Sequence, residues 1–229
     1  MFKVGVLIAG VQDPGAQLEH LAAETQRRGG QVFIYLIDEG VTQVRSELMQ
    51  RLRADGVNLF CCAFGARKRG IAWDESATFG GLSILADMLD NCDSFLVFGP
   101  RGISTSHETG SAERHTLLVG ISDPARSSLP AELIRMAAGL RPWMSGRVDL
   151  LLEGPSVEAL RGEAQGQDWP DSRTLADAVR ALQRSDKPIY LCASEPEPED
   201  FPWEGPPLRW IGPEEAGRMK KAAARVIEL

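Results

Sequence analysis

Residues 31–37, QVFIYLI, are apolar at nearly every position. A strand with one face in solvent alternates apolar and polar residues, whereas a strand covered on both faces shows no such alternation. Gly29 and Gly30 precede the stretch, and Asp38-Glu39-Gly40 follows it as a turn. The stretch therefore predicts an inner strand of a parallel sheet that carries helices on both faces.

The rest of the first half continues this alternation. Further strands are expected at residues 3–9, 57–63 and 94–98, and helices with apolar residues at helical spacing are expected at 17–28, 41–54 and 81–91. Strands that alternate with helices at these lengths are typical of the α/β class. The expected fold is therefore a three-layer α/β/α domain with a parallel sheet.

The second half repeats this order. Strands are expected at residues 116–121, 148–152, 188–193 and 225–229, and helices at 129–140, 172–183 and 213–223. Residues 79–98 align with 210–229 without a gap, and FCCA at 60–63 then corresponds to YLCA at 190–193. We therefore expect a tandem duplication, with one domain at residues 1–100, a linker at 101–114 and a second domain at 115–229.

The composition limits the classes of function. The chain has 229 residues, 43% of them hydrophobic, and a net charge of −7. This acidic charge argues against general binding to nucleic acid or to an anionic membrane, and no apolar run approaches the ~20 residues of a membrane span. Four cysteines in a chain of this length favour free thiols in a reducing cytoplasm over a disulfide framework.

Two of those cysteines are adjacent, at the end of the strand expected at residues 57–63. Cys61 and Cys62 then fall at the carboxyl edge of the sheet, the usual binding edge of open α/β folds. Neighbouring strand residues point to opposite faces, and Cys62, nearer the following loop, is expected to be the accessible thiol. The candidate anion-binding residues follow directly: Arg67, Lys68, Arg69 and Gly70.

Cations beside a cysteine favour its thiolate, which is the reactive form. The cluster could therefore hold a sulfur anion, either as thiolate or as persulfide. The alternative is a pair of small buried side chains followed by a solvated basic turn, because free cysteine is among the most buried residue types.

GVNLFCCAFGARKRGI at 56–71, followed by FGGLSILADMLDNCDSFLVFG at 79–99, resembles the DsrE/DsrF-like family, which includes the TusD-type sulfur-relay subunits. The shared pattern is a strand that ends in cysteine, a small loop, an Arg-Gly pair, a Gly-Leu-containing helix and a closing apolar strand. The resemblance implies a small α/β protein that accepts a persulfide on one cysteine. By position, Cys62 is the carrier and Arg69-Gly70 the Arg-Gly pair.

The resemblance also implies partners. A carrier of this kind receives sulfur from a donor protein and passes it to an acceptor, in sulfur oxidation or in tRNA thiolation, and it needs no cofactor. Members form trimeric or hexameric rings, so a two-domain chain is expected to form a homo-oligomer, as a trimer. Two departures are visible: members are usually single domains, and the loop between Gly70 and Gly80 is short here.

The second half carries a different cysteine site. Cys192 is followed by an acidic stretch that contains Glu195, Glu197, Glu199 and Asp200. Nearby negative charge raises the pKa of a thiol, so Cys192 is expected to be structural, in a degenerate site.

The sequence also bears on metal binding and on two alternative functions. His107 and His115 near the junction lack ligand spacing and are expected to be solvated, so no metal site is expected. Two alternative functions remain: a non-catalytic binding or assembly module, and a site for a small anion.

Overall fold

The structure is a computed structural model, and it describes residues 1–10, 14–99, 102–106, 114–164, 171–192, 201, 203 and 205–229. The chain divides into two compact units, Met1–Glu108 and Thr109–Leu229. Each unit is a largely parallel sheet flanked by helices.

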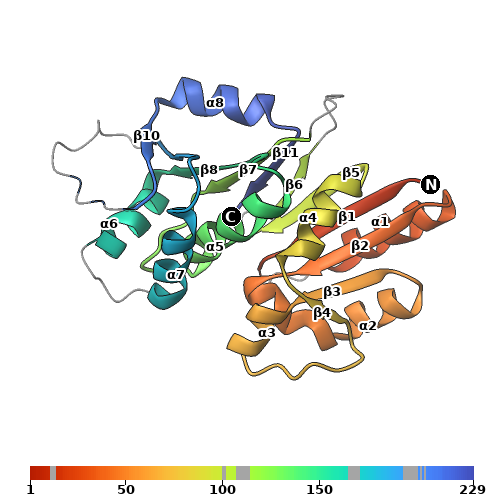
Figure 1. Cartoon of the computed structure of the whole chain (residues 1–229). Coiled ribbons are helices and arrows are strands. Elements are labelled where there is room, and N and C mark those ends of the chain that lie inside the picture. Colours follow the sequence, from red (N-terminus) through yellow and green to blue (C-terminus); the bar gives the residue numbers. More distant parts are fainter. Residues whose placement is uncertain are drawn as a thin grey trace. The chain divides into compact units, whose positions relative to one another are not determined.

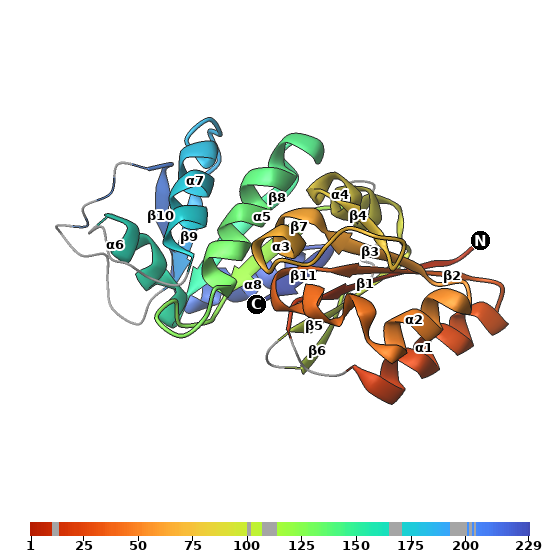
Figure 2. The ribbon, with the colours of Figure 1, turned by 90° about the horizontal axis from the view of Figure 1, so that it is seen from below.

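The first unit contains a sheet with the strand order β4-β3-β2-β1-β5-β6 (Figure 1). Its strands are β1 (Lys3–Ile8), β2 (Gln31–Leu36), β3 (Asn58–Cys62), β4 (Thr78–Gly80), β5 (Ser94–Gly99) and β6 (Gly102–Ser106). Its helices are α1 (Gly15–Arg27), the 3-10 helix η1 (Asp38–Arg45), α2 (Glu47–Ala54), α3 (Ala63–Lys68) and α4 (Leu82–Asn91). Strands β1 to β5 are parallel, and β6 is antiparallel to β5. In Figure 2, α1 and α2 lie on one face of this sheet and α4 lies on the other.

The second unit has the strand order β10-β9-β8-β7-β11, and all its strand pairs are parallel. Its strands are β7 (Thr116–Gly120), β8 (Val148–Glu153), β9 (Ile189–Cys192), β10 (Leu208–Trp210) and β11 (Arg225–Glu228). Its helices are α5 (Leu129–Trp143), the 3-10 helix η2 (Gly154–Val157), α6 (Glu158–Ala164), α7 (Ser172–Leu182) and α8 (Pro213–Ala222). Figure 1 shows α8 on one face of the sheet and α5 and α7 on the other.

The two sheets share both strand order and register. In chain order within each unit, both sheets follow 4-3-2-1-5, and β6 is an addition at one edge. Leu36 of β2 is opposite Cys61 of β3, as Leu152 of β8 is opposite Leu191 of β9. Cys62 and Cys192 are consequently the last residues of equivalent strands, as the alignment of FCCA with YLCA predicts.

The prediction of an inner strand at residues 31–37 is confirmed. Strand β2 lies between β1 and β3, and its residues Ile34, Tyr35 and Leu36 have no exposed surface. Within the part of the chain that the structure describes, no helix is both long and apolar enough to cross a membrane.

Several short elements differ from the sequence expectation. The single helix expected at 41–54 is instead η1 followed by α2. The break falls at Ser46, whose backbone is extended (φ −63°, ψ 152°) and whose Oγ accepts the Met49 N–H at 3.3 Å as a helix N-cap. Helices α3 and α6 and strands β4, β6 and β10 were not expected.

The linker expected at 101–114 contains strand β6, which pairs with β5 from Gly99–Gly102 to Phe95–Ser106. The first sheet therefore extends into the expected linker, and residues 107–113 lie outside the described residues.

Candidate functional site

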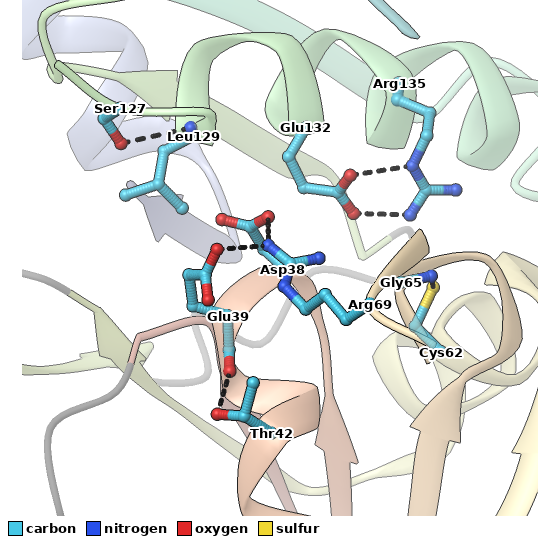
Figure 3. A network of polar contacts seen from close by, with 10 residues as sticks. All are labelled: Asp38, Glu39, Thr42, Cys62, Gly65, Arg69, Ser127, Leu129, Glu132 and Arg135. Atoms are coloured by element: carbon cyan, nitrogen blue, oxygen red, sulfur yellow. Dashed lines mark hydrogen bonds and ion pairs between the residues drawn. The ribbon is translucent and has the colours of Figure 1, made fainter. Parts of the chain in front are cut away.

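Cys62 occupies the junction between β3 and α3. It is the last residue of the strand and the N-cap of the helix, and its Sγ accepts the backbone N–H of Gly65 at 3.5 Å (Figure 3). This hydrogen bond satisfies one of the free amides of the first helical turn. Cys62 has no exposed surface, so the expectation that it is the accessible thiol is wrong for this structure. The sulfur is enclosed because the helix begins directly on the strand instead of after an open loop.

Cys61 points to the opposite face of the sheet from Cys62, because neighbouring strand residues alternate. It is also fully buried. Burial raises the pKa of the Cys61 thiol to about 12, and the neighbouring Cys62 contributes to the rise. Cys61 therefore stays protonated at neutral pH and is poorly suited to act as a nucleophile.

The four residues expected to bind an anion end helix α3, whereas Cys62 begins it. Gly70 has a φ of +65° and follows the helix C-cap at Arg69. The N–H of Ile71 donates to Ala66 O at 2.9 Å, and that of Gly70 donates to Arg67 O at 3.1 Å. This pattern is a Schellman C-cap, in which glycine adopts the left-handed conformation without strain.

Two of these cations, Arg67 and Lys68, lie at the opposite end of α3 from Cys62. Arg67 and Lys68 are exposed in the last helical turn, and the Arg67 guanidinium lies 5.9 Å from the centre of the Phe64 ring. Six residues of helix rise about 9 Å, which separates this turn from the Cys62 end. The Gly65 amide, at the Cys62 end of α3, donates to the sulfur.

Arg69 connects α3 to the start of η1. Its Nη2 lies 2.6 Å from Asp38 Oδ1 and 2.6 Å from Glu39 Oε1 (Figure 3). The Asp38 side chain is 2% exposed and that of Arg69 is 13% exposed, so this ion pair is largely removed from water. The hydrogen bond from Arg69 lowers the pKa of Glu39, against the smaller opposing effect of burial.

The backbone around Asp38 is tightly constrained. Asp38 has a φ of +48°, which is uncommon for a residue with a side chain. Two residues later, a Cβ at Gly40 would lie 2.1 Å from Ile8 O, so η1 packs directly against the carboxyl end of β1. Asp38-Glu39-Gly40 is the turn that the sequence predicts after the strand at residues 31–37. The signal for the ion pair was that Asp38 and Arg69 follow the ends of neighbouring parallel strands.

All four cysteines are free and buried. Cys192 has the largest exposed fraction, at 9%, compared with 2% for Cys92 and none for Cys61 and Cys62. Burial raises the pKa of Cys192, and the negative charge of Glu153, opposite it in the sheet, adds to the rise. The pKa is raised, as expected, but by burial and Glu153; Glu195, Glu197, Glu199 and Asp200, on which the expectation was based, lie outside the described residues.

His115, which is expected to be solvated, has a side chain that is 36% exposed and is also paired with an acidic residue. His115 Nε2 lies 2.9 Å from Asp149 Oδ2, and Lys187 Nζ lies 2.8 Å from Asp149 Oδ1. Burial acts to raise the pKa of Asp149, but the hydrogen bonds from His115 and Lys187 outweigh it, and the pKa lies below its ordinary value. These contacts hold the amino end of β8 in the second unit, and His107 lies outside the described residues.

The chain matches no protein-family model, no curated protein and no solved structure. The resemblance to the DsrE/DsrF-like family therefore depends on the motifs at residues 56–71 and 79–99. Function has to be inferred from the geometry around Cys62.

Replacing Arg69 by methionine should destabilise the first unit by about 3 kcal/mol, because it leaves the buried Asp38 carboxylate without this cation. Arg67→Met is the matched control. Because Arg67 is exposed and lies over the ring of Phe64, its loss should cost less than about 1 kcal/mol. Urea denaturation of both variants measures the difference, and equal losses would contradict a structural role for the Arg69–Asp38 pair.

The lowered pKa of Asp149 predicts an acid-dependent loss of stability in the second unit. A carboxyl group whose pKa is lower in the folded state stabilises the fold above its unfolded pKa of about 3.9 and loses that contribution as the pH falls through its folded pKa. Asp149→Asn should therefore be less stable than wild type at pH 6, and the difference should shrink below about pH 4. Denaturation curves from pH 6 to pH 3 measure it, and a difference independent of pH would argue against this assignment.

Proposed function

We propose that this protein is a sulfur carrier that accepts sulfane sulfur on Cys62 and passes it to a thiol of a partner protein. The observation that carries the proposal is the position of the Cys62 sulfur at the carboxyl end of β3, where it accepts the Gly65 N–H. Hydrogen bonds to a charged acceptor are stronger than those to a neutral one, so this amide favours a sulfur anion over a neutral thiol. The match of Cys62 to the carrier position of the DsrE/DsrF-like motif supports the same residue.

The proposed reaction needs no cofactor. The Cys62 thiolate attacks the outer sulfur of a donor persulfide, a bond forms between the two sulfurs, and the donor leaves as a thiolate. Cys62 is then a persulfide, and an acceptor thiolate removes its outer sulfur in the same way. Each step resembles thiol–disulfide exchange, and no external oxidant or reductant enters.

Burial of Cys62 restricts how a donor can reach it. Because the residue has no exposed surface, α3 or its surroundings must move before sulfur can be transferred. The donor and acceptor are expected to be proteins that bind near the carboxyl edge of the first sheet, as in a relay for sulfur oxidation or tRNA thiolation.

The same burial favours a second candidate, a binding or assembly module that has kept the fold without the chemistry. In this candidate, Cys62 is a small core residue whose sulfur caps α3, and Arg69 stabilises the start of η1 through its ion pair with Asp38. This candidate predicts thiols that react only when the protein unfolds.

The common strand order and register of the two sheets support a tandem duplication as the origin of the chain. A duplicated chain has two copies of the fold in each subunit, and we propose a trimer of such chains. Light scattering on the purified protein measures the assembly, and the mass of a monomer would contradict this part of the proposal.

The test of the carrier function is the intact mass of the reduced protein after incubation with a small persulfide donor. Wild type and Cys61→Ala should gain the mass of one or more sulfur atoms, removable by a reductant, and Cys62→Ala should not. Cys61 is the matched control because it is the adjacent cysteine, is equally buried and has a raised pKa. Absence of any gain in wild type, or a gain that persists in Cys62→Ala, would reject Cys62 as the carrier and favour the binding module.

A further inference from the structure

Helix α8 covers Cys192 in the second unit. Cys192 belongs to a buried apolar cluster on the α8 face of the sheet. The sheet contributes Leu117, Val119, Leu151 and Cys192 to this cluster, and α8 contributes Ala216, with Met219 packed against it. In Figure 1, α8 lies on the face of the second sheet opposite to α5 and α7. Access to the thiol from this side therefore depends on whether α8 stays in place.

The apolar attachment of α8 is weak. Within α8 itself Ala216 is the buried residue, and Ile211 and Ala223 are buried just outside its two ends, whereas the equivalent helix α4 of the first unit buries Leu82, Leu85, Ala86, Met88 and Leu89. Gly217 lies in the middle of α8, and glycine weakens a helix interior. Outside the neighbouring helix backbone, no described atom lies within 4 Å of where a Cβ on Gly217 would stand.

Ion pairs supply much of the remaining attachment. Lys220 Nζ lies 2.7 Å from Glu153 Oε2 at the end of β8 and 3.3 Å from Glu228 Oε2 at the end of β11. Near the other end of the helix, Glu215 Oε1 lies 2.7 Å from Arg209 Nη2 of β10. The Lys220 side chain is 31% exposed and that of Glu153 is 23% exposed, so water and salt can reach these charges.

The equivalent positions of the first unit carry no charge. The alignment of residues 79–98 with 210–229 places Leu89 opposite Lys220 and Val97 opposite Glu228. Ile37 follows Leu36 as Glu153 follows Leu152, and these two leucines hold equivalent register positions. Ile37, Leu89 and Val97 are all fully buried. Three buried apolar residues of one unit are thus replaced together by a lysine that pairs with two glutamates in the other.

We propose that α8 is a salt-sensitive cover over Cys192, which opens locally while the sheet and the helices on its other face stay folded. Opening exposes the Cys192 thiol together with the apolar strip formed by Leu117, Val119 and Leu151. Segments with few buried apolar contacts and partly exposed polar ones are those that open at the lowest free energy. The cover does not depend on the proposed sulfur chemistry at Cys62.

Alkylation of native protein by iodoacetamide, resolved by peptide mass, tests the cover. Cys192 should react faster than Cys61 and Cys62, and its rate should rise with salt between 0.1 and 1 M, where the Debye length falls from about 10 to 3 Å. Lys220→Met should raise the rate about fivefold to tenfold, the change that follows from losing two partly exposed ion pairs. It should also remove most of the salt dependence.

Two further variants should lower the alkylation rate of Cys192, opposite to the effect of Lys220→Met. The triple variant Glu153→Ile, Lys220→Leu, Glu228→Val introduces the residues of the first unit and should slow alkylation and remove most of its salt dependence, leaving that of the Arg209–Glu215 pair. Gly217→Ala strengthens the helix without adding a contact and should slow alkylation about fivefold.

Hydrogen exchange distinguishes local opening from unfolding of the whole unit. Peptides from α8 should exchange faster than those from β7 and α5, and Lys220→Met should accelerate α8 alone. Uniform exchange across the second unit would overturn the proposal. A Cys192 alkylation rate unaffected by salt and by Lys220→Met would overturn it as well, even if Cys62 proves to carry sulfur.

Discussion

Burial of both faces of a parallel sheet is the constraint on which the rest of this structure depends. A strand covered on both sides has no place for a polar side chain along its length, since an unpaired buried polar group costs free energy. Polar and reactive groups are therefore confined to strand ends. Cys62 and Asp38 lie at or just after the ends of β3 and β2, and Cys192 and Glu153 are the last residues of β9 and β8. The two aligned cysteines of this protein consequently lie at the carboxyl ends of equivalent strands.

The two units use this edge in different ways. In the first, α3 starts on Cys62 itself, and the Arg69–Asp38 pair fixes the far end of that helix to η1. In the second, Cys192 lies under α8, which is attached by small residues and by the charges around Lys220. Cys62 is thus enclosed by the short helix that it caps, whereas the equivalent Cys192 is enclosed by α8, which is weakly packed.

The Arg-Gly pair of the family-like motif has a structural explanation in this protein. Gly70 supplies the left-handed residue that ends α3, and Arg69 neutralises a buried carboxylate. The motif residues thus shape the helix that begins at Cys62, whose sulfur accepts the Gly65 N–H.

The sequence by itself determined the α/β class, the parallel inner strands and the equivalence of Cys62 and Cys192, because long apolar runs and the spacing between them are local properties of the chain. Strands such as β4 and β10, with three residues each, exist only because a neighbouring strand pairs with them, so no local pattern indicates them. The enclosure of Cys62 and the pairing of Arg69 with Asp38, 31 residues away, were decided by the tertiary structure. Burial and ion pairing depend on which strand ends become neighbours, and that arrangement exists only once the sheet has formed.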